Sequence, residues 1–289
     1  MQGHKMNDKS EAGGDTAFSA PSERQTQGSR AIDCMRLNQK TAYMGKIGRL
    51  RERYCLDQMR YMKVCHQKIG QDQMSYVEAK GQTISCARGC SSCCRFVYVG
   101  ATLQECEAIA YYLWHNEPAR NSWLKRFPGW REAVRQGGDT FQYCEQIFSN
   151  MLLLGQDRQR EKAFAKALRA HNKQRLVCPF LENDLCLIYE IRPSNCAGFF
   201  VTTPPEQCRP TGLSEPEFNI TTIDDVVSDV SFYYQSLACP VTLYMPVAVY
   251  RIMEEGFAYL SRFPGLDGLE SAALSDPEVQ AIIRSSSLE

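Results

Sequence analysis

Two groups of closely spaced cysteines constrain this chain more than any other feature of its sequence. The first, CARGCSSCCRF at residues 86–96, places four cysteines within nine positions, so one loop can turn several thiols toward a single centre. The second, CPFLENDLCLIYEIRPSNC at residues 178–196, lies about 84 residues downstream. Groups that are distant in sequence can meet in space, and we take all of their cysteines as candidate metal ligands. These are Cys86, Cys90, Cys93, Cys94, Cys178, Cys186 and Cys196.

The choice between metal ligands and disulfides depends on the cellular compartment. The first 30 residues contain no apolar segment typical of a secretion signal, and the chain has no run of about 18 apolar residues that would span a bilayer. We therefore expect a cytoplasmic protein without a membrane partner, where closely spaced cysteines more often bind metal than form disulfides. The 33 basic and 33 acidic residues cancel, so charge gives no indication of a nucleic-acid partner.

Helical periodicity predicts a mainly α fold, irregular in layout, with a small cysteine-rich metal-binding core and minor short strands. From about residue 36 to 80, apolar residues recur at spacings of three and four, with Gly45, Gly48 and Gly70 as candidate interruptions. The N-terminal tail is too polar to offset the entropy lost on ordering. We divide the chain into a disordered tail (1–30), a helical region (31–80), a cysteine-cluster metal-binding domain (81–200), a helical C-terminal part of the same globule (201–270), and a short helix and tail (271–289).

The clearest helix start is at Thr102, where Glu105 completes the T-x-x-E spacing of a capping box. The preceding FVYVG, at residues 96–100, is a short β-prone run. A second helix is expected at about residues 139–172, and its charged final part is expected to face solvent.

The C-terminal part of the chain contains weaker patterns. Prolines within residues 197–220 predict an irregular connection. Apolar residues from Val247 to Leu260 trace an amphipathic helix. Asp276 before Pro277 matches the preferences of a helix start and predicts a short final helix.

The number and spacing of the thiols leave the metal open. Structural zinc takes four ligands, and the downstream spacings are wider than those usual in a zinc knuckle. An iron–sulfur cluster also takes four thiolates, and a compact run of three plus a distant fourth is a familiar way to supply them. The remaining cysteines would serve a second metal or tune the first as outer-shell groups. We prefer an iron–sulfur cluster and keep zinc as the alternative.

In their order along the chain, CARGCSSCC, a short strand, a T-x-x-E helix and the CPFL and IYEIRP segments resemble the YkgJ-type family of CxxCxxCC proteins, zinc- or iron-chelating domains. The resemblance covers residues 86–200, about two fifths of the chain. Two features depart from it: the first spacing is three residues instead of two, and Ala197 follows the last cysteine where a basic residue is expected. The resemblance implies metal binding through the cysteines of both groups.

The chain is also distantly similar to flagellin lysine-N-methylases. That similarity implies a 4Fe-4S cluster and S-adenosylmethionine-dependent methyl transfer to a lysine of a protein substrate. The competing hypothesis is a non-catalytic protein whose saturated zinc or iron site is structural or stores metal. A closed shell of four cysteines favours structure, whereas three cysteines and an open position favour chemistry.

The spacing of Cys86, Cys90 and Cys93 is also that of radical S-adenosylmethionine enzymes. Those enzymes need repeated strand–helix units that build a partial barrel. The long helical patterns and the scarcity of alternating strands argue against that fold here.

Two further residues are candidates for cofactor binding. Arg192 can offer its guanidinium to a carboxylate or phosphate, or form a structural salt bridge beside the second group. Tyr189 can donate to a sulfur or a cofactor, although its place in LCLIYE favours a ring packed in the core. Cys208 and Cys239 could supply spare ligands from the less regular C-terminal part. We treat the other cysteines as small apolar residues or non-ligands: Cys34, Cys55, Cys65, Cys106 and Cys144.

Overall fold

A computed structural model describes residues 34–87, 89–95, 98–136, 158–204, 208, 218–220, 242–263, 266–275, 277 and 280. Most of these residues are helical and the strands are short, which confirms the mainly α class. The tail expected at 1–30 lies outside the described residues, as do Cys144, Cys239 and the first part of the FVYVG run.

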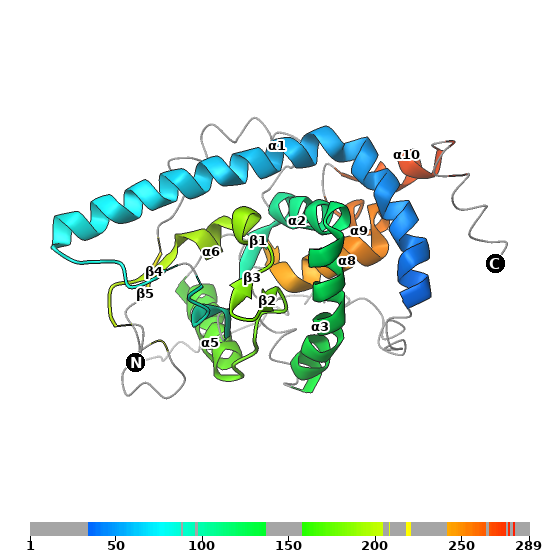
Figure 1. Cartoon of the computed structure of the whole chain (residues 1–289). Helices are drawn as coiled ribbons and strands as arrows, with labels where there is room; N and C mark the ends of the chain where they lie inside the picture. Colours follow the sequence, from blue (N-terminus) through cyan, green and yellow to red (C-terminus); the bar gives the residue numbers. More distant parts are fainter. Residues whose placement is uncertain are drawn as a thin grey trace, which may run out of the picture.

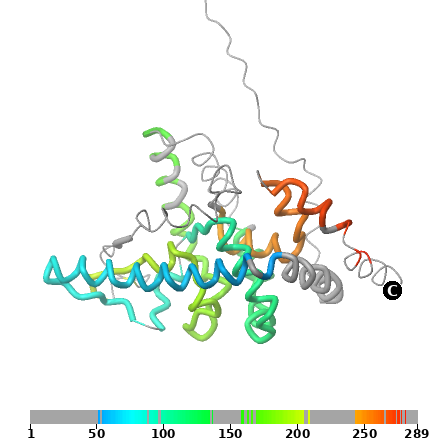
Figure 2. Tube along the Cα trace, turned by 90° about the horizontal axis from the view of Figure 1, so that it is seen from above, coloured from blue at the N-terminus to red at the C-terminus, as the bar shows by residue number. Residues whose placement is uncertain are grey.

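The long helix α1, Cys34–Lys80, crosses over the other elements (Figure 1, Figure 2). It continues through Gly45, Gly48 and Gly70, so the interruptions that we considered do not occur. A glycine costs a helix only about 1 kcal/mol relative to alanine, and packing along one face of α1 outweighs that cost. The buried side chains on this face recur every three or four residues: Cys55, Gln58, Met62, Cys65, Ile69, Gln73 and Val77.

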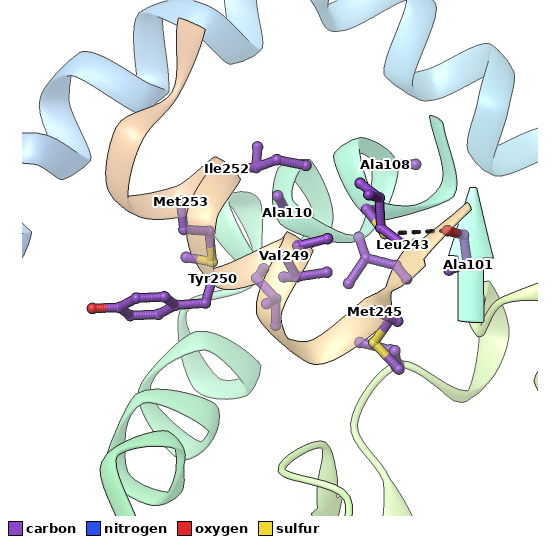
Figure 3. Close-up of a cluster of buried hydrophobic side chains, with 14 of the residues drawn as sticks. Ala101, Ala108, Ala110, Leu243, Met245, Val249, Tyr250, Ile252 and Met253 are labelled. Carbon is purple, nitrogen blue, oxygen red and sulfur yellow. Dashed lines mark hydrogen bonds between the residues drawn. The ribbon is translucent and has the colours of Figure 1, made fainter. Parts of the chain in front are cut away.

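The core lies where α1 packs on α2, Leu103–His115, and on α8, Met245–Glu255. The predicted capping box starts α2: the Thr102 hydroxyl accepts a hydrogen bond from the Glu105 N–H, and the Glu105 carboxylate accepts one from the Thr102 N–H. Figure 3 shows small side chains of α2 facing larger ones of α8 and its preceding strand: Ala108, Ala110, Leu243, Val249 and Ile252.

Three antiparallel strand pairs join segments of the described chain. β1, Gly100–Thr102, pairs with β6, Thr242–Tyr244, and so brings the start of α2 beside the start of α8. The other two pairs are β2, Leu181–Glu182, with β3, Leu185–Cys186, and β4, Phe199–Val201, with β5, Phe218–Ile220.

Two longer helices remain among the described elements: α3, Glu117–Gln136, and α5, Arg158–Lys173. α3 contains Pro128 and has no counterpart among our predictions. The other elements are short: the 3-10 helices η2, Cys93–Arg95, and η3, Tyr189–Ile191; α6, Ser194–Gly198; α9, Phe257–Leu260; and α10, Leu269–Ser275.

Several local predictions need correction. The strand expected at 96–100 begins only at Gly100. Within 197–220, expected to be irregular, residues 199–201 and 218–220 pair as β4 and β5. The helix through Val247 and Leu260 divides at Gly256, whose φ of 57° lies in the left-handed region and ends α8.

Two further predictions are only partly testable. Of the helix expected at 139–172, α5 accounts for residues 158–172, and the earlier part lies outside the described residues. Its charged side chains that the structure describes are exposed: Arg158, Lys162, Lys166, Arg169 and Lys173. His171, in contrast, is buried, and its Nε2 lies 2.9 Å from the Tyr244 hydroxyl. Most of the final helix expected from Asp276 also lies outside the described residues.

Candidate metal centre

A β-hairpin brings two cysteines of the second group together. β2 and β3 pair with Leu181 opposite Cys186, while Cys178 lies just before β2 and its carbonyl accepts a hydrogen bond of 3.0 Å from the Leu181 N–H. Asn183 and Asp184 form the turn with φ values of 49° and 62°. Such turns favour Asn and Asp, which tolerate the left-handed region. The hairpin therefore converts a spacing of eight residues into proximity of the two thiols.

The first cysteine loop docks on this hairpin. The Cys178 N–H donates a hydrogen bond of 2.6 Å to the carbonyl of Cys94. At the hairpin turn, the Asp184 carboxylate accepts a hydrogen bond of 2.6 Å from the Ser91 hydroxyl and forms an ion pair with Arg95. These contacts join the two cysteine groups across about 84 residues of sequence.

The third downstream cysteine, Cys196, lies on α6, which α1 and α2 hold in place. Glu105 of α2 accepts a hydrogen bond of 2.8 Å from the Ser194 N–H at the start of α6. Gln73 of α1 donates to the carbonyls of Ala197 and Gly198 at its end, at 3.1 and 3.2 Å. The capping carboxylate of α2 thus also positions a candidate ligand.

Arg192 and Tyr189 form a pair beside the thiols. The Arg192 guanidinium carbon lies 4.1 Å from the centre of the Tyr189 ring, and the Arg192 carbonyl accepts a 2.8 Å hydrogen bond from His66 of α1. The Tyr189 ring is 36% exposed, so the expectation that it packs in the core is wrong. The structural reason is that η3 turns the ring outward and buries Ile191 instead.

Four of the seven candidate thiols form an inner set: Cys93, Cys178, Cys186 and Cys196. Each of the four lies near enough to the other three to interact electrostatically. All four are partly buried, whereas Cys86 and Cys90 are exposed. The inner set contains one cysteine from the first group and all three from the second.

Burial is the largest cause of the raised pKa in three of the four inner thiols, those of the second group. Burial, reinforced by nearby Cys186 and Cys93, raises the pKa of Cys178 to about 12. Burial likewise raises the pKa of Cys186 and of Cys196, and a hydrogen bond with Cys94 followed by burial raises that of Cys93. Without a cation these thiols stay protonated at neutral pH. Metal binding would therefore release protons, and the affinity would rise with pH.

Backbone groups of the hairpin favour the thiolate form. The N–H of Phe180 hydrogen-bonds to Cys178 and that of Ile188 to Cys186, and each opposes the rise in pKa that burial causes. The positive charge of Arg192 opposes the burial-driven rise in the pKa of Cys186 and Cys196 in the same way. Hydrogen bonds to sulfur and nearby charge are the means by which proteins tune metal-bound thiolates.

The chemistry of the inner set fits a thiophilic metal, but its side chains are not arranged as a coordination shell. Among the described residues, no three Cys, His, Asp or Glu side chains are placed to hold a metal ion. Cysteine has a single side-chain torsion with three staggered positions, so thiols that are already neighbours can turn toward a common centre. The cysteine-rich metal core therefore remains a prediction.

The other candidates occupy different environments. Cys94 is partly buried, and its side chain forms a hydrogen bond with that of Cys93. Cys208 is buried. Cys55, Cys65 and Cys106 are buried, as expected for cysteines that act as small apolar residues. Sequence reasoning did not identify Gln73, His66 or Asp184 as residues that hold the site together. Their partners lie 89 to 126 residues away, so no local pattern indicates them.

Comparison with known proteins gives no relative. No family model, curated protein or solved structure matches this chain. The resemblance to the YkgJ-type family and to flagellin lysine-N-methylases therefore stays a prediction from the motifs. No helix among the described residues is long and apolar enough to cross a membrane.

Proposed function

We propose that this chain is a cysteine-cluster metalloprotein in which both cysteine groups supply one centre. The ligands are the inner set, Cys93, Cys178, Cys186 and Cys196. The observation that carries the proposal is the mutual proximity of these four thiols, which come from a loop, a hairpin and α6. Four thiolates are the number that a tetrahedral zinc ion or a 4Fe-4S cluster requires.

We keep an iron–sulfur cluster as the preferred group and zinc as the alternative. A cluster would supply electron transfer, and zinc would supply structural cross-linking. The N–H groups of Phe180 and Ile188 support either choice because they hydrogen-bond to the sulfurs of Cys178 and Cys186. Four protein thiolates close the coordination shell, which favours a structural or electron-transfer centre over a reactive one.

One observation favours the catalytic alternative, methyl transfer from S-adenosylmethionine to a protein lysine. The Arg192 Nε is buried and has no hydrogen-bond partner among the described residues. Its guanidinium lies over Tyr189 and near the thiols of Cys186 and Cys196. A carboxylate such as that of S-adenosylmethionine would satisfy this donor. In this proposal Arg192 and Tyr189 hold the cofactor and one inner cysteine leaves an iron open.

The test is anaerobic purification from the cytoplasm of a bacterial host, with metal and sulfide analysis and an absorption spectrum. We expect stoichiometric metal, with broad visible absorption if a cluster is bound. Replacement of all four inner cysteines by alanine removes the metal, whereas the matched control Cys106→Ala, a buried cysteine of α2, retains it. Zinc without visible absorption would eliminate the cluster and keep the centre. Equal metal content in the quadruple variant and the control would refute the centre itself.

The catalytic alternative has its own test. S-adenosylmethionine is added to the reduced protein, and the electron paramagnetic resonance signal of the cluster is recorded. A changed signal in the wild type, reduced in Arg192→Lys, supports cofactor binding beside Arg192. An unchanged signal counts against direct ligation and leaves the metal centre as the function.

A further inference from the structure

A histidine and two tyrosines from distant parts of the chain meet in the core, and all three are buried. His171 of α5 lies 2.9 Å from the Tyr244 hydroxyl through its Nε2. The ring of Tyr98 stacks on that of Tyr244, with ring centroids 4.3 Å apart and planes inclined by 10°. The His171 ring stands edge-on to both tyrosine rings. None of the three residues belongs to the proposed metal centre.

Asn172 fixes the position of the proton on His171. Its side-chain oxygen Oδ1 accepts a hydrogen bond of 3.3 Å from the Tyr98 N–H, and the same oxygen lies 3.4 Å from His171 Nδ1. An oxygen acceptor requires a donor, so Nδ1 carries the proton. Burial lowers the pKa of His171 and keeps the ring neutral. The other nitrogen, Nε2, therefore has no proton and accepts the hydrogen bond from the Tyr244 hydroxyl.

Burial limits the chemistry that is open to the Tyr244 hydroxyl. A hydroxyl buried among aromatic rings does not contact a substrate in solution, but an electron can leave its ring by tunnelling through neighbouring rings. Tyr98 is one such neighbour, and Trp130 of α3 is another, with its ring centroid 5.8 Å from that of Tyr244. Both neighbours are 7% exposed, against 3% for Tyr244, so they are more accessible to an oxidant.

Oxidation of a tyrosine requires a base at its hydroxyl. The phenol keeps its proton at neutral pH, because its ordinary pKa is about 10. It loses that proton as the electron leaves, because the oxidised phenol is a strong acid. A neutral imidazole within hydrogen-bond distance takes the proton directly. His171 Nε2 is neutral, free of a proton and 2.9 Å from the hydroxyl, so it meets these conditions.

We propose that Tyr244 is a redox-active tyrosine, which gives one electron to a strong one-electron oxidant of the peroxyl-radical class and its hydroxyl proton to His171. The observation that carries the proposal is the buried Tyr244–His171–Asn172 relay beside a stacked second tyrosine. The proposal goes beyond the metal centre and does not depend on it.

The step is balanced in electrons and protons. The O–H bond of Tyr244 breaks, its electron passes through Tyr98 or Trp130 to the peroxyl radical, and its proton moves to His171 Nε2. The reduced peroxyl takes a proton from solvent and leaves as a hydroperoxide. A neutral tyrosyl radical and a His171 imidazolium remain. A one-electron reductant such as ascorbate then returns the electron, and the proton returns from His171 to Tyr244.

The experiment generates tris(bipyridine)ruthenium(III) by a light flash in the presence of the protein and records tyrosyl radicals by electron paramagnetic resonance. Exposed tyrosyl radicals decay rapidly by pairing with one another, whereas a buried radical cannot, so the long-lived component is measured. We expect this component in the wild type and in the control Tyr250→Phe, which alters another buried tyrosine. Tyr244→Phe should remove it. A long-lived component of equal size in Tyr244→Phe, or none in the wild type, would overturn the proposal.

The role of His171 has a separate readout. In His171→Gln, the amide still accepts a hydrogen bond but does not hold a proton. The long-lived radical should therefore form about a hundredfold more slowly, the lower end of what a positioned base contributes. A wild-type rate in His171→Gln would refute the proton relay.

A measurement on the wild type alone covers the case in which a variant does not fold. After the flash in D₂O, electron–nuclear double resonance of the long-lived radical should detect one strongly coupled deuteron, which His171 holds in its hydrogen bond to the Tyr244 oxygen. Absence of that deuteron would overturn the proposal without any substitution.

Discussion

At the scale of single residues, the seven candidate cysteines differ in their surroundings, from the exposed Cys86 and Cys90 to the partly buried Cys178 and Cys196. Cys93 and Cys94 are adjacent, and Cys93 interacts electrostatically with Cys186 and Cys196 of the second group. Cys94 instead hydrogen-bonds to Cys93, and its carbonyl accepts from the Cys178 N–H. We therefore treat Cys94 as an outer-shell neighbour.

Single alanine variants should separate ligands from neighbours. Cys94→Ala should weaken metal affinity by about 10–100-fold, the usual effect of losing an outer-shell group. Cys196→Ala should weaken it by more than that, because a ligand is lost. Competition titration with a chelator of known affinity measures both. Equal losses in the two variants would contradict the division into ligands and neighbours.

His171 provides a pH-dependent contribution to stability. Burial lowers the pKa of His171, and its ring lies edge-on to Tyr98 and Tyr244. In the unfolded chain, the His171 imidazole has the ordinary histidine pKa of about 6.5. Below that pH the unfolded chain takes up a proton at His171 that the folded protein binds less readily. This contribution is fully present above about pH 6.5 and declines below it, by up to about 1.4 kcal/mol per pH unit.

The measurement is urea unfolding of the wild type and His171→Gln at pH 7.5 and 5.5. His66, whose pKa burial also lowers, acts in the same direction and is present in both proteins. We expect the wild type to lose more stability on acidification than the variant. Identical losses would show that His171 does not couple folding to pH.

At the scale of elements, Glu105 joins the start of α2 to the start of α6. One carboxylate oxygen accepts from the Thr102 N–H and the other from the Ser194 N–H, and the residue is buried. Loss of this group removes a helix cap and leaves the Ser194 N–H without its partner. Together these changes should cost about 2–4 kcal/mol.

The comparison of Glu105→Ala with Thr102→Ala isolates the link to α6. Thr102→Ala should destabilise the protein by only about 1 kcal/mol, because it removes the cap alone. Only Glu105→Ala should also weaken metal affinity, because Cys196 then loses its positioning contact. Chemical unfolding and metal titration give the two quantities. Unchanged affinity in Glu105→Ala would refute the positioning role.

Sequence reasoning succeeded for elements whose cause is local. Thr102 and Glu105 are three residues apart, and the long apolar stripe of α1 lies within one helix, so both were predicted correctly. The pairing of Gly100–Thr102 with Thr242–Tyr244 has no local cause, and neither does the partnership of Gln73 with α6. The hairpin around Asn183 and Asp184 was missed because we gave the turn chemistry of ENDL no weight.

At the scale of the whole molecule, one centre would tie together four parts of the chain. The first cysteine loop, the β2–β3 hairpin, α6 and, through its contacts, α1 all meet beside the inner set. A ligand that binds only the folded state stabilises it by about 4 kcal/mol at a thousandfold excess over its dissociation constant. Removal of the metal should therefore affect global stability.

Chelation should lower the melting temperature of the protein by about 10 °C, since 1 kcal/mol corresponds to roughly 2–4 °C in a chain of this size. Restoring the metal should reverse the shift. Differential scanning calorimetry under anaerobic conditions measures it, and the quadruple alanine variant serves as the control that should not respond. A wild-type protein that melts at the same temperature with and without metal would contradict a structural role.

The central claim is that the two cysteine groups supply four thiolates to one centre. X-ray absorption at the edge of the bound metal tests it most directly, because the fine structure reports the atoms of the first shell. We predict an all-sulfur shell at about 2.3 Å, the usual metal–thiolate distance, in stoichiometric yield. A first shell that contains nitrogen or oxygen, or a protein that carries no stoichiometric metal, would contradict the account.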